Sequence, residues 1–491
     1  MTGSWITGWI TRGAIVALGV LLAWGVPSVS VRASPADDLP VLGDVSSSIV
    51  SPEMEAAIGE DFMRQIRAGL PTRSDPLIVH WTEQLLYELA AASDLRRVDL
   101  NLVLIDSGAI NAFAAPGGIV GINYGTFAEA PTVHEFSAIL AHELAHLSQR
   151  HFARGLEEQR KATLPFLAAL LASAAIMAAG GGDAGMAALA GTQALAQQNQ
   201  LRYSRSRERE ADRLGIETMV RAGMDPWAMA GMFERMTDVY RFSRRPPEFL
   251  LTHPVTESRI ADARSQASAY PRRPHPDSVE FQLARARVRL HLADTPAAAA
   301  ERFRAELEDG RSTNPEAPRY GLAISLLALG RVDEAERVLA PLLEAEHPRL
   351  FYTLAQAEVM LGRDETGKAI ALLERELRFT PEALPLRRAY ADALGRAGRH
   401  GAAQKVLEEL ATDRPSDASV WYALAETAGL AGDIIAVHRA RAEYFQLHGN
   451  LQNALQHLQY ALQLVENDYP MTARLNQRMQ DIREMRQRAA S

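Results

Sequence analysis

Hydrophobic and polar residues alternate with the period of an α-helix along most of the chain. The pattern predicts helices over residues 54–68, 76–92 and approximately 135–160. Between the second and third of these helices, the apolar run 100–105 is typical of a strand. Residues 111–124 predict two further strands joined by a Pro-Gly-Gly turn. The sequence therefore predicts a mainly α-helical fold with a small antiparallel sheet directly before the third helix.

The second predicted strand begins with Asn111, Ala112 and Phe113. If it lies at the edge of the sheet, its free backbone groups can pair with an extended peptide, as a substrate would do. The alternative is a hairpin with a purely structural role, and the sequence leaves both interpretations open.

The third predicted helix contains the pentad His-Glu-Leu-Ala-His. His142 and His146 are four residues apart, so their imidazoles share one face of the helix and can reach one metal ion. Glu143 would stand beside that ion as a general base. Thr132 and Glu135 form a T-x-x-E capping box that marks the start of the helix. The alternative is a pair of histidines at the edge of the core whose spacing is accidental.

Composition limits the chemistry that such a site can use. The chain has 491 residues, 47% of them hydrophobic and 23% charged, which is typical of a globular protein of two to four domains. Its net charge of −8 and the lack of a basic block argue against nucleic acid as a partner. There is no cysteine, which excludes disulfides and thiolate ligands, so any transition-metal site must be built from histidines and carboxylates.

A third metal ligand is therefore expected among the carboxylates of a nearby helix. Glu208 and Asp212 are four residues apart and share a face of the helix predicted around them, whereas Glu210 points elsewhere. Glu208 can then bind the metal while Asp212 accepts a hydrogen bond from a ligand histidine. The alternative is an acidic helix face that is simply solvated.

The first residues have the pattern of an export signal. A single arginine precedes an apolar run of about 14 residues, which is shorter than the roughly 20 that span a membrane, and small residues follow it. We expect a cleaved signal peptide over 1–33, an extended lead-in over 34–51 and a periplasmic location; an uncleaved anchor is the alternative. The alanine-rich segment 162–196 predicts a packed helical hairpin, with peripheral membrane contact as its alternative.

The C-terminal part of the chain is repetitive. Gly330, Gly362, Gly398 and Gly432 each lie between two helical patterns, at spacings of 32, 36 and 34 residues. These spacings are close to the 34 residues of a tetratricopeptide repeat and predict an α-helical solenoid. A cluster of prolines and arginines over 270–276 marks the boundary of this region. We therefore expect one domain over 52–272, which carries the pentad, and a tetratricopeptide repeat domain over 273–491.

The motifs together resemble a known enzyme family. The His-Glu-Leu-Ala-His pentad and the Glu-x-Glu-Ala-Asp of residues 208–212 are similar to those of the zinc metallopeptidase family of HtpX and the CAAX prenyl endopeptidases. The segments 111–113, 146–151 and 252–254 and the repeats strengthen the resemblance. It implies a mainly helical zincin-like metalloprotease domain with a small β-sheet, followed by the solenoid.

The resemblance also implies a role for individual residues. Glu143 matches the catalytic base, and Asp212 matches a carboxylate that orients a ligand histidine. His253 matches a histidine that can occupy the open position on the metal and block it. The ligands implied for one Zn²⁺ per chain are His142, His146 and Glu208.

Signal, protease and repeats together resemble family members that act on outer-membrane proteins in the bacterial periplasm. The implied substrates are unfolded or misassembled outer-membrane proteins. The implied partner of the repeats is the machinery that assembles outer-membrane β-barrels. Two functions remain open: an endopeptidase that degrades misfolded or stalled proteins, and a chaperone or scaffold whose repeats bind that machinery.

Overall fold

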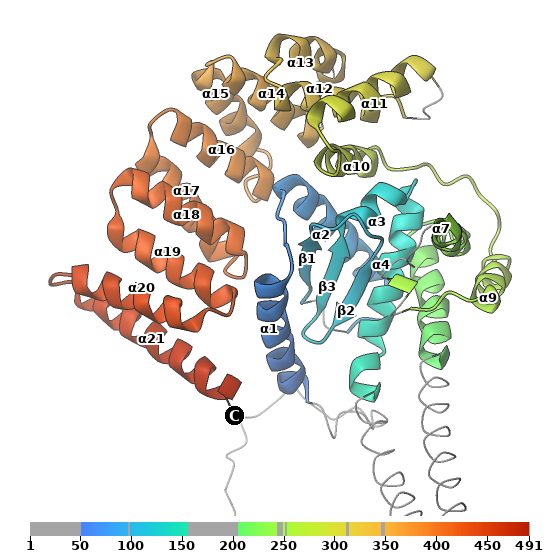
Figure 1. Cartoon of the computed structure of the whole chain (residues 1–491), viewed down its shortest axis with the longest axis horizontal. Helices are drawn as coiled ribbons and strands as arrows, with labels where there is room; N and C mark the ends of the chain where they lie inside the picture. Colours follow the sequence, from blue (N-terminus) through green and yellow to red (C-terminus); the bar gives the residue numbers. More distant parts are fainter. Residues whose placement is uncertain are drawn as a thin grey trace, which may run out of the picture. The chain divides into compact units, whose positions relative to one another are not determined.

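The computed structural model describes residues 51–96, 99–155, 205–242, 249–250, 253–310, 314–344 and 349–490. Within these ranges the protein is mainly α-helical and holds one three-stranded sheet, as predicted (Figure 1). None of the helices in these ranges is both long enough and apolar enough to cross a membrane. The predicted signal peptide, nearly all of the lead-in and the predicted hairpin over 162–196 lie outside the described residues.

Helices α1 (Pro52–Gly69) and α2 (Pro76–Ala92) agree with the sequence pattern within two residues at each end. Each begins with a proline in its first turn, where the missing N–H costs no hydrogen bond. The preceding residues cap them: the Ser51 hydroxyl accepts from the third residue, and the Asp75 carboxylate accepts from Leu77 and Ile78.

The sheet is mixed, and the antiparallel prediction is wrong for one of its two strand pairs. Strand β3 (Ile119–Asn123) lies between β1 (Asn101–Ile105) and β2 (Ala112–Ala115), parallel to β1 and antiparallel to β2. Residue patterns specify strands but not their partners. The 13 residues from 106 to 118 are long enough for the crossover that a parallel pair requires. The arrangement leaves β2 at an edge of the sheet.

Helix α4 (Val133–Ser148) carries the histidine pentad, after the short helix α3 (Tyr124–Glu129). The Thr132 hydroxyl accepts from Glu135 N at 3.2 Å, as the capping box predicts. The expected extension to residue 160 is wrong, because α4 ends at Ser148. Arg150 adopts a left-handed φ of 48°, which breaks the helix before a new one begins at residue 151.

Three further helices follow: one over residues 205–221, then α7 (Ala228–Phe242), which packs on α4, and α9 (Glu257–Ala267), which packs on α7. A Cβ atom at Gly215 would lie 3.3 Å from the backbone nitrogen of His142 and 3.0 Å from Met229 Cε. Glycine at this position therefore lets the helix over 205–221 approach the pentad closely.

The repeat region consists of helices that pack against their neighbours in sequence, as predicted. Gly330, Gly398 and Gly432 end helices in a left-handed conformation, whereas after Gly362 it is Asp364 that does so. A 3₁₀ turn over Ala340–Leu343 follows α13. The helices are α10 (Val279–His291), α11 (Pro296–Asp309), α12 (Glu316–Ala328), α13 (Val332–Leu339), α14 (Leu350–Gly362), α15 (Thr366–Leu377), α16 (Leu384–Arg396), α17 (His400–Asp413), α18 (Ala418–Ala431), α19 (Ile434–Leu447), α20 (Leu451–Leu464) and α21 (Tyr469–Ala490).

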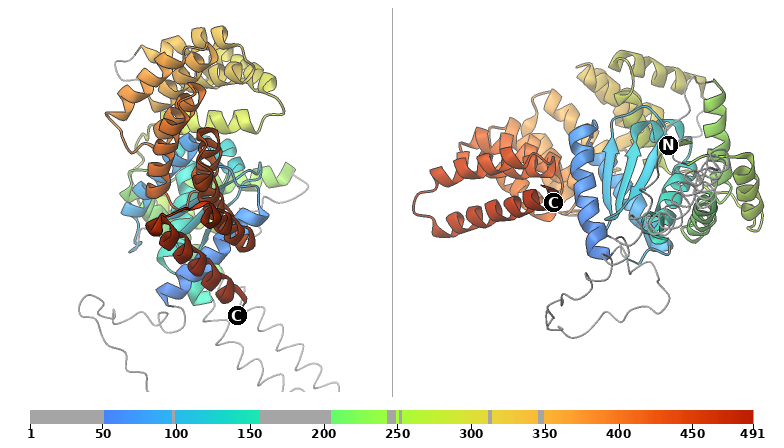
Figure 2. Two further views of the ribbon diagram at one scale, coloured as in Figure 1. Left: turned by 90° about the vertical axis from the view of Figure 1, so that its left-hand side faces the viewer. Right: turned by 60° about the horizontal axis from the view of Figure 1, so that its bottom comes forward.

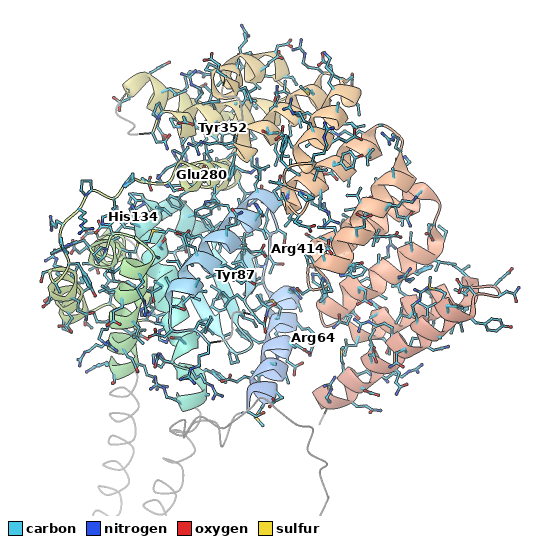
Figure 3. All side chains as sticks on the ribbon, turned by 180° about the vertical axis from the view of Figure 1, so that it is seen from behind. Arg64, Tyr87, His134, Glu280, Tyr352 and Arg414 are labelled. Atoms are coloured by element: carbon cyan, nitrogen blue, oxygen red, sulfur yellow. The ribbon has the colours of Figure 1, made fainter. Side chains whose placement is uncertain are left out.

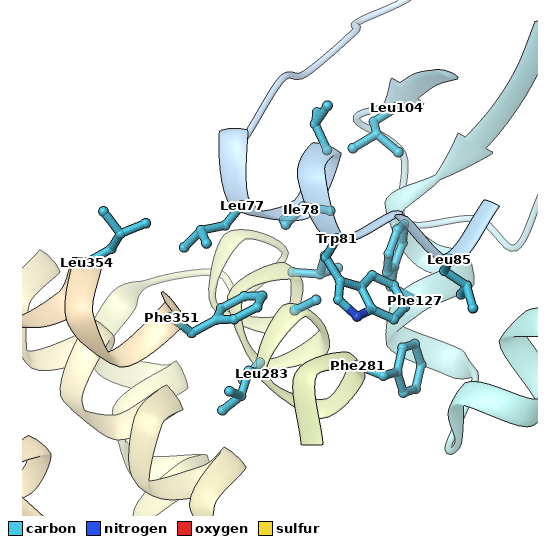
Figure 4. Packing of buried hydrophobic residues seen from close by; sticks show 14 of the residues in the cluster. Leu77, Ile78, Trp81, Leu85, Leu104, Phe127, Phe281, Leu283, Phe351 and Leu354 are labelled. Atoms are coloured by element: carbon cyan, nitrogen blue, oxygen red, sulfur yellow. The ribbon is translucent and has the colours of Figure 1, made fainter. Parts of the chain in front are cut away.

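The first repeat helices share a hydrophobic core with the N-terminal half. Trp81 of α2 packs against Phe127 of α3 and Phe281 of α10, with ring centroids 6.3 and 5.5 Å apart (Figure 4). Leu354 of α14 belongs to the same cluster. Because this core is continuous, α10 and α14 stabilise the helices that support the sheet and α4.

Charged contacts also join the repeats to α1 and α2. Arg414 binds both carboxylate oxygens of Glu83, and Arg67 donates to the carbonyl of Ser416 at 2.8 Å. Figure 3 labels Arg414 beside α2. Helix α1 also packs on the sheet, beside which it runs in Figures 1 and 2. These contacts link the C-terminal repeats to the layer that supports the pentad.

Candidate metal centre

Helix α4 holds the pentad in the interior of the protein. His142 and Glu143 are each 1% exposed, and the side chain of His146 is 14% exposed. Burial of polar side chains is costly unless they are paired, so the surroundings of the pentad decide what it can do.

Four groups that could bind a metal lie close together beside α4. His142 Nε2 and His146 Nε2 are 3.0 Å apart, and His253 Nδ1 lies 3.3 Å from His142 Nε2. Both Glu208 oxygens lie 3.1 Å from His253 Nδ1. Glu208 also lies 3.4 Å from His142 Nε2 and 3.5 Å from His146 Nε2. Among the described residues, this is the group whose ligand atoms could hold one metal ion.

The spacing of the donors fits a tetrahedral metal site. Ligand atoms about 2.0–2.1 Å from a zinc ion in tetrahedral geometry lie about 3.3 Å from one another. Five of the six pairs of donor groups lie 3.0 to 3.5 Å apart, which brackets this value, and all four ligand atoms lie within 4.8 Å of one another. Three imidazoles and one carboxylate are also a donor set that zinc accepts.

Glu143 lies beside this group without being part of it. Its Oε1 atom is 3.6 Å from His253 Nε2 and, although buried, has no hydrogen-bond partner among the described residues. The backbone of Ala114, in the edge strand β2, hydrogen-bonds its carboxylate, but burial outweighs this contact and raises the pKa of Glu143. A buried carboxylate oxygen that lacks a partner indicates a site for a further polar group, such as a water molecule.

Asp212 and Arg259 contact the donor groups on the side that faces away from the metal position. Asp212 Oδ1 lies 3.0 Å from His142 Nδ1, on the side of the ring that faces away from the donor group. Arg259 donates to both Asp212 oxygens at 2.7 Å, and it also lies 3.0 Å from Glu208 Oε2. Burial opposes ionisation of Asp212, but hydrogen bonds to His142 and Arg259 outweigh it and hold its pKa below the usual value. Asp212 therefore stays negatively charged in the interior.

The same pairing determines the charge on the other donors. Burial opposes charge on His142, yet its hydrogen bonds to Asp212 and Glu208 raise its pKa to about 10. Burial also disfavours ionisation of Glu208, but hydrogen bonds to His142 and His253 lower its pKa. Burial and the neighbouring His142 lower the pKa of His146. Glu208 and Asp212 therefore stay ionised and hold a proton on His142, whose place a metal cation would take.

The structure brings together His142, His146, Glu208, His253, Glu143 and Asp212, which the sequence analysis had proposed from distant segments. It places Ala112 and Phe113 in the edge strand β2 and Asn111 directly before it.

Sequence reasoning missed Arg259 and His151. Arg259 follows His253 by six residues in α9, and a lone arginine there gives no signal of its own. His151 follows the pentad by five residues, beyond the end of α4, and its ring faces His146 across 2.7 Å. The histidine itself was visible in the sequence, but the break at Arg150 that turns it toward the pentad was not.

The sequence matches two known family patterns. Residues 77–267 match Peptidase family M48, and residues 384–427 match a tetratricopeptide repeat. Together with the converging donors, the first match defines the protein as a zinc metalloendopeptidase, a hydrolase, and the second defines its C-terminal helices as tetratricopeptide repeats.

Whole-chain relatives specify the family further. The beta-barrel assembly-enhancing protease of Escherichia coli (strain K12) is 32% identical over 93% of this chain and 93% of its own length. The protein of that name from Yersinia pestis is 33% identical over 92% of this chain and 93% of its own length. The mitochondrial metalloendopeptidase OMA1 of Homo sapiens is 26% identical over 41% of this chain and 39% of its own length. The chain belongs to the family of beta-barrel assembly-enhancing proteases.

Proposed function

We propose that the protein is an endopeptidase of the bacterial periplasm that cleaves misfolded or stalled outer-membrane proteins at a single Zn²⁺ site. The observation that carries the proposal is the convergence of four donor groups, with ligand atoms within 4.8 Å of one another, beside the buried carboxylate of Glu143. The proposed zinc ligands are His142, His146 and Glu208.

The protein's own residues then have defined tasks. Zinc, when bound, supplies a Lewis acid that polarises the scissile carbonyl and lowers the pKa of a water molecule. Glu143 takes the proton of the attacking water and delivers it to the leaving nitrogen, and its raised pKa suits both steps. General acid–base catalysis of this kind contributes about 10²–10⁴ in rate. Asp212 keeps His142 in the tautomer that presents Nε2 to the metal.

His253 makes the resting enzyme latent in this proposal. A catalytic zinc site keeps one position open for water or substrate. His253 Nδ1 lies 3.1 Å from Glu208 and 3.3 Å from His142 Nε2, which is where a fourth ligand would be. We propose that a substrate or partner must displace it before cleavage.

The edge strand β2 is the proposed substrate platform. It lies against α4, and the backbone of Ala114 contacts Glu143, so a peptide that pairs with this edge would run past the catalytic base. Asn111, Ala112 and Phe113 form the start of this platform. An added strand gains main-chain hydrogen bonds without demanding a particular sequence, which suits an enzyme that acts on unfolded proteins.

The repeats favour a second activity on the same chain. Tetratricopeptide helices form binding surfaces and carry no catalytic chemistry of their own. The names of the whole-chain relatives refer to β-barrel assembly. We propose that the repeats bind the machinery that assembles outer-membrane β-barrels and that the protein also assists assembly as a chaperone. Peripheral membrane contact through 162–196 is part of the same proposal.

The test compares the wild type with two variants on an unfolded outer-membrane β-barrel protein. Glu143→Gln should retain zinc, by metal analysis, and lose cleavage at least 100-fold. His253→Ala should cleave faster than the wild type. Glu217→Gln is the matched control, because Glu217 pairs with the exposed Arg213 on the helix that carries Glu208. Cleavage by Glu143→Gln at the wild-type rate would overturn the assignment of the base, and unchanged or slower cleavage by His253→Ala would overturn latency.

A further inference from the structure

His151 lies directly behind the metal centre because the chain turns back after α4. Arg150 takes the left-handed conformation at φ 48° and donates to Glu55 of α1 at 3.2 Å, which fixes the turn. The next helix therefore starts with His151 aimed at the pentad. Its Nδ1 atom lies 2.7 Å from His146 Nδ1, and the residue is 5% exposed.

The hydrogen-bond directions along this contact are determined by His146. Its Nε2 atom belongs to the donor group, so in the neutral ring Nδ1 carries the hydrogen. The Nδ1 atom of His151 must then accept, which puts its own hydrogen on Nε2. That nitrogen lies 3.2 Å from Glu210 Oε2, a carboxylate oxygen that can only accept. Each ring thus has one consistent tautomer from the metal centre outward.

The outer end of this series is held in place as well. Arg154 donates to the same Glu210 oxygen at 2.9 Å, and Arg207 donates to the backbone carbonyl of His151 at 3.2 Å. Glu210 lies between Glu208 and Asp212 in sequence but faces away from both, as its helical position predicts. One helix therefore supplies a carboxylate to each side of the centre.

We infer that His151, oriented by Glu210, is a positioning residue that fixes the tautomer and ring orientation of His146. The inference rests on the proposed function, since it assigns His146 to the metal. His151 does for His146 what Asp212 does for His142, so each ligand histidine on α4 has its own partner. Partners of this kind typically account for 10- to 100-fold in metal affinity.

The test measures zinc affinity of the full chain by competition with a chromophoric chelator. His151→Phe keeps the ring volume and removes the acceptor, and it should weaken zinc binding about 10- to 100-fold. His151→Asn places an oxygen where Nδ1 was and should restore most of the affinity. The visible spectrum of the Co²⁺-substituted protein should change in His151→Phe and return toward that of the wild type in His151→Asn.

His134→Phe is the matched control. His134 lies on the same helix and hydrogen-bonds the carbonyl of Pro276 at 3.2 Å, away from the centre, so its replacement should leave zinc affinity unchanged. If His151→Phe does not fold, Glu210→Leu tests the same contacts, because it removes the half-buried carboxylate that orients His151.

Three outcomes would overturn the inference. Zinc affinity of His151→Phe within twofold of the wild type is one, and failure of His151→Asn to restore affinity is another. In both, the wild type still binds zinc and the proposed function stands. A wild type that binds no zinc is the third, and it removes the proposed function as well.

Discussion

Arg259 is the residue whose loss should destabilise the metal-free protein most clearly. It is 4% exposed, donates twice to Asp212 at 2.7 Å, and donates to the carbonyl of Pro254 at 2.9 Å. Arg259→Leu would leave Asp212 charged, buried and without its guanidinium partner. Breaking a buried pair in this way costs about 3–5 kcal/mol. We expect the free energy of unfolding of the metal-free variant to fall by that amount.

The same helix supplies the control. Arg264 of α9 pairs with Glu234 at the surface, where the two side chains are 58% and 39% exposed. Exposed ion pairs contribute about 0–1 kcal/mol. Arg264→Leu should therefore lower the free energy of unfolding by no more than this, although it removes the same charge from the same helix.

Urea unfolding of both variants, followed by circular dichroism, measures the difference. A double variant, Arg259→Leu with Asp212→Leu, should lose less than the sum of the two single variants, because it leaves no buried charge unpaired. Equal losses for Arg259→Leu and Arg264→Leu would refute the argument, since burial would then have no effect on the cost.

Three further predictions concern acid stability, the edge strand and the metal. Burial raises the pKa of Asp75, but Arg287 and the N–H groups of α2 outweigh it, so its folded pKa lies below the unfolded value of about 3.9. The stability that ionised Asp75 gives the protein is therefore present above about pH 4 and is lost as the pH falls through the folded pKa. Asp75→Asn keeps a capping side chain. In urea unfolding at a series of pH values, this variant should lose less stability with acid than the wild type. Gly121→Ala would place a Cβ atom 2.2 Å from the ring of Phe113, and the displaced ring should cost about 1–3 kcal/mol and slow cleavage of unfolded substrates. Treatment with a chelator should abolish cleavage, and added Zn²⁺ should restore it.

The sequence predicted those parts of the fold that depend on local chemistry. Thr132 caps α4 as the capping box predicted, and periodicity located α1 and α2, whose starts Ser51 and Asp75 cap beside a proline in the first turn. Three of the four expected turns between repeat helices lie at the predicted glycines, Gly330, Gly398 and Gly432. In each instance the cause lies within a few residues of its effect.

Features that depend on tertiary contacts were not accessible in the same way. Thr132 caps α4 as predicted, but the Glu135 side chain binds Arg235, 100 residues further along the chain. The parallel pairing of β1 with β3 depends on a crossover that periodicity does not encode. The end of α4 depends on the left-handed Arg150, for which the sequence offers no glycine as a signal.

The same distinction between local and tertiary features applies to the residues of the metal centre. Its inner residues carry chemistry that is visible in isolation: two histidines at helical spacing, and carboxylates four residues apart. Arg259 and His151 act only through the groups they contact, and an arginine or a histidine alone does not reveal which carboxylate or imidazole it will meet. Predicting them would have required the contact of α9 with the helix over 205–221 and the direction of the helix after Arg150.

Arg259 also bears on how the proposed latent site opens. It donates to Pro254, the residue after His253, while it holds Asp212 and contacts Glu208. When His253 leaves the metal position, the chain must therefore rotate about the hydrogen bond between Arg259 and Pro254 or break that bond. A hydrogen bond from a charged donor contributes about 1.5–3 kcal/mol. A substrate shifts this equilibrium only by the free energy with which it prefers the open form. Each main-chain hydrogen bond of an added strand contributes about 0.5–1.5 kcal/mol. Two to four such bonds along β2 would match the free energy of the hydrogen bond at Pro254. A peptide must therefore be extended over several residues before it can open the site. This requirement selects unfolded segments over the loops of a folded protein.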